Sequence, residues 1–233
     1  MKKVVLVFFF LIFSFKTYAQ EIICCSALTA NQIMVLTVAK AQLNDRLKQG
    51  RLVYDEEHLF DELNYRGELL GPTKKENKTI DGKRGQLAGI DLSIGQLLER
   101  LATGHDFSFA PSILRDGERF AVIEFKPKPG LKYITNEDKF INRLRGKLYI
   151  YFLDYSLWKV EAEIPERDEF KFRVWRGPFF LTINIKSFRL EFEQVTYGDI
   201  MVEKRIGVVA RFVALSATKT RRYTYYYDNY RYK

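Results

Sequence analysis

The stretch from Arg145 to Ile164, RGKLYIYFLDYSLWKVEAEI, alternates apolar and polar side chains on both sides of a short polar break. Period-two alternation around a polar turn is typical of an antiparallel hairpin with one buried face. The apolar positions predicted to share that face are Leu148, Ile150, Phe152, Trp158, Val160, Ala162 and Ile164. Glu161 and Glu163 are then expected on the opposite, polar face.

Similar alternation continues through most of the following chain. Within Ser187 to Val195, for example, Phe188, Leu190 and Phe192 oppose Arg189, Glu191 and Glu193. The strands expected after the hairpin are Phe170–Trp175, Phe179–Ile185, Ser187–Val195, Met201–Leu215 and Lys219–Tyr227. Those expected before it are Leu52–Tyr65, Glu68–Ile80 and Arg119–Lys126, the last entered through a turn at Asp116-Gly117.

Two helices are predicted, over Ala27–Gln49 and Ser93–Ala102. Thr29 is the expected N-cap of the first helix and Gly50 its stop signal, whereas Asp91 or Ser93 caps the second. The first helix either covers the open face of the sheet as part of a binding site or simply packs there, and its sequence fits both interpretations. Leu131–Arg143 is expected to be a polar connection.

The N-terminus has the pattern of a cleavable secretory signal. Lys2 and Lys3 precede an apolar run from Val4 to Phe13, which is shorter than the roughly 18 residues that span a bilayer. Thr17-Tyr18-Ala19 then supplies a small residue before the expected cleavage point. We therefore expect residues 1–19 to be a signal peptide and residues 20–233 to form a single exported, periplasmic domain, because no repeat or linker divides them.

Charge and cysteine content exclude several classes of protein. Removing Lys2, Lys3 and Lys16 with the signal lowers the formal net charge from +9 to +6, which suits peripheral contact with anionic lipid headgroups. No nucleic-acid-binding motif appears, so no nucleic-acid partner is expected. The two cysteines, Cys24 and Cys25, are adjacent, which excludes a structural disulfide framework, and Ile23 before them is a poor context for lipidation.

The titratable residues do not form a convincing catalytic or metal site. His58 stands among carboxylates as a single histidine, and transition-metal sites usually need several converging His or Cys ligands. His105 follows a predicted helix end and is expected to complement that end. Glu161 and Glu163 are explained by strand alternation alone. The sequence contains no nucleophile elbow, metalloprotease motif or phosphate loop, so we expect no catalytic residues, no metal and no cofactor.

The C-terminal stretch from Arg221 to Lys233 interleaves six tyrosines with three arginines. Such a pattern suits base stacking, glycan binding or a membrane interface. The favoured interpretation is a closing strand with one aromatic row packed inside and the other at the surface, because aromatic residues are normal strand formers.

Residues 118–233 resemble a bacterial envelope family related to the outer-membrane lipoprotein-sorting carriers, of the LolA- and LolB-like type. The resemblance consists of ERFAVIEFKPKPG, LRGKLYIYFLDYSLWKVEAEI, FRLEFEQVTYGDIMVEKRIGV and YDNYRYK, in this order. Tyr149 stands where a tryptophan is usual, and Val202-Glu203 replaces a common proline-containing pair. The resemblance implies an α+β fold: a curved antiparallel sheet, an unclosed β-barrel, whose concave face is covered by the N-terminal and internal helices.

The resemblance also implies a non-catalytic periplasmic binding protein that shelters a lipid or an acylated protein in that concave face. The expected cavity residues are Leu148, Ile150, Phe152, Trp158, Val160, Phe188, Leu190 and Phe192. They present more apolar surface than a soluble monomer normally exposes, so a pocket under the N-terminal helix is expected unless side chains fill it. The alternative function is an envelope sensor or scaffold that uses the same sheet to bind a protein partner.

Overall fold

The computed structural model describes residues 28–81, 93–131, 135–176 and 179–233. The predicted signal peptide and the Cys24-Cys25 pair lie outside these residues. In chain order the elements are α2 Ala30–Lys48, β1 Leu52–Leu63, β2 Lys74–Asp81, α3 Ile94–Gly104, β3 His105–Arg115, β4 Glu118–Pro127, α4 Asn136–Ile141, β5 Arg145–Tyr151, β6 Leu157–Ile164, a 3-10 turn Glu166–Asp168, β7 Phe170–Arg176, β8 Phe179–Tyr197, β9 Ile200–Ala214 and β10 Ala217–Tyr232. The α+β class is confirmed.

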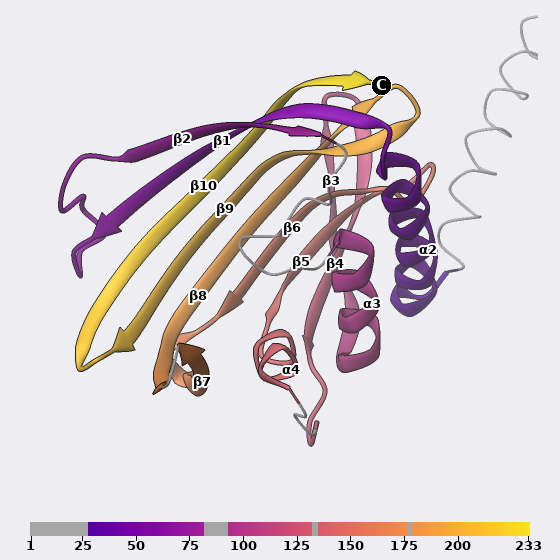
Figure 1. Cartoon of the computed structure of the whole chain (residues 1–233). Helices are drawn as coiled ribbons and strands as arrows, with labels where there is room; N and C mark the ends of the chain where they lie inside the picture. The colour runs from indigo at the N-terminus through magenta and orange to yellow at the C-terminus, as the bar shows by residue number, and fades with distance from the viewer. Residues whose placement is uncertain (1–27, 82–92, 132–134, 177–178) are drawn as a thin grey trace, which may run out of the picture.

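All ten strands belong to one antiparallel sheet. The strand order is β2-β1-β10-β9-β8-β6-β5-β4-β3, with β7 paired only to β8. The outermost strands β2 and β3 do not pair with each other, so the curved sheet is not closed into a barrel, as expected. Figure 1 shows α2, α3 and α4 on one side of this sheet, which is its concave face.

Both predicted helices form, and each begins at a capping box. The Thr29 side chain accepts a hydrogen bond from the Gln32 backbone amide at 3.2 Å, and Ser93 accepts one from Gln96 at 3.3 Å. The Gln32 and Gln96 side chains accept hydrogen bonds from the capping residues' backbone amides in return. Neither helix is long and apolar enough to cross a membrane within the described part of the chain.

The buried face of α2 does not follow the leucines of its sequence. Leu36 and Leu43 are exposed. The buried positions are Ala30, Ile33, Met34, Thr37, Ala41 and Asn44, which recur at helical spacing but include small and polar residues. Small side chains on this face allow α2 to lie close to the elements on which it packs.

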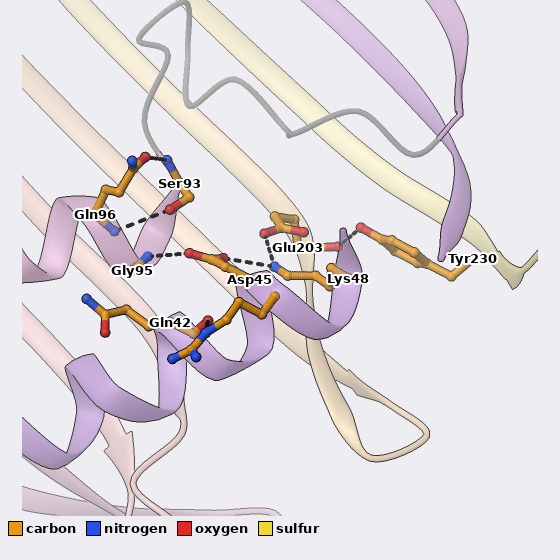
Figure 2. Close-up of polar contacts among 9 residues, drawn as sticks. Gln42, Asp45, Lys48, Ser93, Gly95, Gln96, Glu203 and Tyr230 are labelled. Carbon is orange, nitrogen blue, oxygen red and sulfur yellow. Dashed lines mark hydrogen bonds and ion pairs between the residues drawn. The ribbon is translucent and has the colours of Figure 1, made fainter. Parts of the chain in front are cut away.

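Polar contacts fix the α2–α3 pair to the sheet (Figure 2). The Gly95 backbone amide at the start of α3 donates to Asp45 Oδ2 of α2 at 3.0 Å. Lys48 Nζ, at the end of α2, contacts Glu203 Oε1 of β9 at 2.6 Å. The Tyr230 hydroxyl of β10 donates to the Glu203 backbone carbonyl at 2.6 Å. These contacts join the two helices to the strands on which they lie.

Beneath α2 and α3 the concave face is a filled core. Leu148, Ile150, Val160 and Phe192 are at most 1% exposed and belong to the same buried cluster as helix residues such as Leu98. Close packing of this kind is normal in protein interiors. This part of the concave face is therefore packed with side chains.

The hairpin β5–β6 forms as predicted, but a bulge shifts its second arm. Tyr149 is opposite Lys159 while Ile150 is opposite Leu157, so Leu157 and Trp158 together occupy the place of one residue. Leu157 takes the buried position, and the Trp158 ring lies 4.7 Å from Phe120 on the convex face. The prediction that Trp158 shares a face with Val160 is wrong, because one extra residue reverses the alternation.

Two other expectations are corrected. The separate strands predicted before and after Lys186 are one long strand, β8, with a bulge between Ile185 and Ser187. Along one edge of β8, the first half pairs with β7 and the second half pairs with β6. The supposed polar connection before Arg143 contains α4, which is capped by Thr135 with Asp138. The Asp116-Gly117 turn is confirmed, with positive φ at both residues, as a type I′ hairpin requires.

Candidate apolar binding site

An apolar pocket of about 420 Å³ lies on the concave face between α4, β7 and the strands β8, β9 and β10. Its lining residues are Asn136, Glu137, Phe140, Ile141, Phe170, Ile183, Ile185, Phe188, Val208, Ala210, Phe212 and Tyr223. All but two of these carry apolar or aromatic side chains. The pocket volume falls within the roughly 300–1,000 Å³ typical of small-molecule sites.

The pocket is built by strand alternation on its floor and by a short helix at its side. Val208, Ala210 and Phe212 point inward from β9 at spacing two, and Tyr223 is opposite Val208 on β10. On the other side, the Phe140 ring of α4 meets Phe188 edge-on at 4.7 Å. The same ring lies 6.3 Å from Phe170 of β7, so α4 contacts the sheet through two aromatic pairs at the side of the pocket.

Charged side chains flank this aromatic surface. The Arg143 guanidinium lies 4.9 Å from the centre of the Phe170 ring, and the Arg221 guanidinium lies 5.6 Å from that of Phe212. The carboxylate of Glu137 is 3.8 Å from Arg100. The pocket therefore has an apolar interior, and cationic side chains contact aromatic rings at its edge.

A second, wider depression of about 660 Å³ lies over β3, β4, β5, β6 and β8. Its lining is dominated by charged residues such as Glu124, Lys147, Glu161 and Arg189. Several of these pair with one another, as in the 3.3 Å contact between Lys147 and Glu124. These charged side chains are solvated and neutralise one another, so the depression is a poor binding site for an apolar ligand.

Of the eight residues expected to line the cavity, the structure places Phe188 in the lining of this pocket. Phe152 is partly buried against the core, and Trp158 is on the convex face. The remaining five are buried in the hydrophobic core: Leu148, Ile150, Val160, Leu190 and Phe192. Leu190 is directly opposite the lining residue Val208 in the β8–β9 ladder, so this core adjoins the pocket.

The pocket residues that sequence reasoning missed had a signal. Val208, Ala210 and Phe212 alternate within the predicted strand Met201–Leu215, and Tyr223 does so in the next. The α4 wall was hidden because its capping box, Thr135 to Asp138, stands in a polar stretch. Nothing in the sequence shows which part of the concave face the helices leave uncovered.

The histidines occupy structural positions. His105 Nε2 lies 2.9 Å from the Leu144 carbonyl oxygen, and Nδ1 lies 3.2 Å from that of Leu101, at the end of α3. Burial lowers the pKa of His105. His58 contacts the Glu56 carboxylate and meets Tyr225 edge-on at 4.4 Å. Among the described residues, no three His, Cys, Asp or Glu side chains are placed to hold a metal ion.

Glu161 belongs to the polar face of β6, as predicted. It accepts a hydrogen bond from the Tyr149 hydroxyl at 2.8 Å and contacts Lys159 Nζ at 2.7 Å. Burial together with the Glu161 carboxylate raises the pKa of Tyr149 to about 12. These contacts explain the residue as part of a cross-strand network.

The C-terminal tyrosines divide between the two faces of β10. Tyr223, Tyr225 and Tyr227 face inward, where Tyr223 lines the pocket, while Tyr226 between them is exposed. The packed inner row and exposed outer residues agree with the favoured sequence interpretation.

No protein-family model matches the sequence. No curated protein matches it either. Among solved structures, the chain is similar to a LolA superfamily protein from Nitrosomonas europaea, with 9% identity, 89% of this chain and 94% of that chain covered, and a TM-score of 0.38. It is also similar to a putative outer-membrane lipoprotein-sorting protein domain from Vibrio parahaemolyticus, with 12% identity, 86% and 93% coverage, and a TM-score of 0.34.

A third similar structure is a chain of the MucA/MucB complex of Pseudomonas aeruginosa, with 9% identity, 84% and 99% coverage, and a TM-score of 0.25.

Proposed function

We propose that this protein is an exported, periplasmic binding protein that shelters an acyl chain of a lipid or of an acylated protein. The observation that carries the proposal is the apolar pocket between α4 and β8–β10. Every methylene moved from water into such a pocket contributes about 0.8 kcal/mol, and no covalent chemistry is needed. The N-terminal signal pattern supports the proposed compartment.

Two substitutions on adjacent positions of β9 test the proposal. Ala210 lines the pocket, whereas its neighbour Val209 points to the opposite face. Ala210→Trp should fill the pocket and abolish binding of a fluorescent fatty acid, and Val209→Trp should leave binding unchanged. Mass spectrometry of organic extracts of the wild-type protein from its native envelope should then identify a lipid that Ala210→Trp lacks.

If the wild-type protein releases no lipid and binds no fatty acid, the carrier proposal fails. Equal binding by both tryptophan variants, each shown to be folded by circular dichroism, would place the lipid elsewhere. Either result can be read directly because the two variants differ by one position on the same strand.

The second candidate function is an envelope sensor or scaffold that binds a protein partner. Two observations favour it: the filled core beneath α2 and α3, and the edge strand β3. This strand pairs with β4 alone among the described strands and carries exposed Phe109 and Leu114. An extended partner segment can add to such an edge. Phe109→Lys should abolish partner capture without changing fatty-acid binding if this function holds.

A further inference from the structure

Four side chains form a row across the concave face from β2 to β9, in the order Lys74, Phe60, Arg221 and Phe212. Lys74 is opposite Phe60 in the β1–β2 ladder, and its ammonium lies 5.6 Å from the centre of that ring. The Arg221 guanidinium is 5.4 Å from the centre of the Phe60 ring and 5.6 Å from that of Phe212. We name these four residues the cationic row.

The cationic row is contiguous with the pocket. Phe212 belongs to both, and Arg221 is directly opposite Ala210, another lining residue, in the β9–β10 ladder. Tyr223, two residues after Arg221 and on the same face, also lines the pocket. The Arg221 side chain therefore lies next to residues that line the apolar pocket.

The positive charge of the cationic row is weakly neutralised. Arg221 Nη2 is 3.4 Å from Glu62 Oε1, but the Glu62 side chain is 50% exposed, and such surface pairs contribute little. Arg221 Nε is buried and has no hydrogen-bond partner. Among the described residues, the Lys74 ammonium contacts the Phe60 ring and makes no ion pair. The Arg221 side chain as a whole remains 30% exposed, so its guanidinium can contact an incoming anion.

We propose that the cationic row binds the carboxylate of a long-chain fatty acid whose tail lies in the apolar pocket. This inference rests on the proposed function. Arginine offers donors in a planar fork that matches a carboxylate, and the flanking Phe60 and Phe212 rings hold the guanidinium plane in place. A volume of about 420 Å³, near the lower end of ligand sites, favours one acyl chain over the two of a phospholipid.

The test compares palmitate with hexadecanol, which has the same chain length and no charge. Arg221→Gln should raise the dissociation constant for palmitate about tenfold and leave that for hexadecanol unchanged, because only the charged headgroup loses its partner. Lys74→Gln should have a smaller effect in the same direction, and Arg221→Lys should recover part of the loss. Binding of palmitate, but not of hexadecanol, should weaken with added salt.

Matched controls are Arg189→Gln and Lys75→Gln, which remove the same charges from the opposite face of the sheet. Both should bind palmitate as the wild type does. If palmitate and hexadecanol bind equally and Arg221→Gln changes neither, the carboxylate assignment is overturned while the pocket remains a lipid site. If neither ligand binds the wild type, the proposed function fails and the assignment fails with it. Arg221-dependent binding of lysophosphatidic acid without binding of palmitate would also overturn the assignment.

Discussion

The indole of Trp158 packs 4.7 Å from the ring of Phe120, on the face of the sheet opposite Val160. The Arg115 guanidinium lies 4.6 Å from the indole centre, and Tyr149 meets the indole edge-on at 5.9 Å. These four side chains form a cluster on the convex side, away from the pocket. Its packing therefore stabilises the sheet on the convex side.

Trp158→Ala should therefore lower stability without changing fatty-acid binding. The expected loss is about 2–3 kcal/mol, less than for a fully buried aromatic residue because the indole is only partly buried. Urea unfolding measures the loss, and a fatty-acid titration measures binding. Phe188→Ala is the comparison, because it removes a ring that lines the pocket and should weaken binding. A folded Trp158→Ala protein that binds no fatty acid would contradict this placement.

The threonine caps of α2 and α4 offer a matched pair. Thr135→Ala and Thr29→Ala each remove a capping box, at a cost of about 1 kcal/mol of stability. Only Thr135→Ala should weaken fatty-acid binding, because α4 forms the wall of the pocket while α2 covers the filled core. Isothermal titration with both proteins decides this. Equal affinities would mean that α4 does not contribute to the site.

The crossing of α2 and α3 depends on the absence of a side chain at Gly95. A Cβ atom there would lie 2.7 Å from Asp45 Oδ2 and 3.1 Å from Gln42 Cα. Because the second contact is with backbone, Gly95→Ala should destabilise the protein by about 1–3 kcal/mol, despite the higher helix propensity of alanine. Gly71→Ala is the control, since open space surrounds that position. Chemical denaturation that shows Gly95→Ala as stable as the wild type would disprove the close crossing.

His105 should make stability depend on pH. Burial lowers the pKa of His105, and the nearby Lys128 charge lowers it further. The Leu144 and Leu101 carbonyls and the Asp106 carboxylate raise the pKa, but by less than burial lowers it. The unfolded state therefore binds a proton more readily, so this contribution is complete above the ordinary value of about 6.5 and is lost as the pH falls below it. Unfolding free energies from about pH 8 to pH 5 should decline more steeply for the wild type than for His105→Gln. Equal slopes would refute this role.

Local chemistry made most of the elements predictable. Capping residues such as Thr29 and Ser93 identified helix starts, and alternation identified strands, because both depend on near neighbours in sequence. Two bulges, at Trp158 and beside Lys186, could not be predicted in this way. Each inserts one residue into a ladder, and the alternation alone cannot reveal which face a side chain occupies beyond that point.

The position of the pocket depended on information that is not local. The residues expected at the site, such as Leu148 and Val160, are apolar and on the concave face, but α2 and α3 cover them. The actual lining combines α4 with four strands, and its composition differs little from that of the core. The difference between a filled and an open part of one face depends on where three helices rest, which strand periodicity does not encode.

The brevity of α4 has a consequence for how the pocket exchanges with its surroundings. A helix of six residues is not stable by itself, so its order depends on the Thr135 cap and on the packing of Phe140 against Phe188. Amide hydrogens of α4 should consequently exchange with solvent much faster than those of α2, which is held by the filled core. Local unfolding of this one turn and a half would open a route into the pocket while the rest of the sheet stays folded.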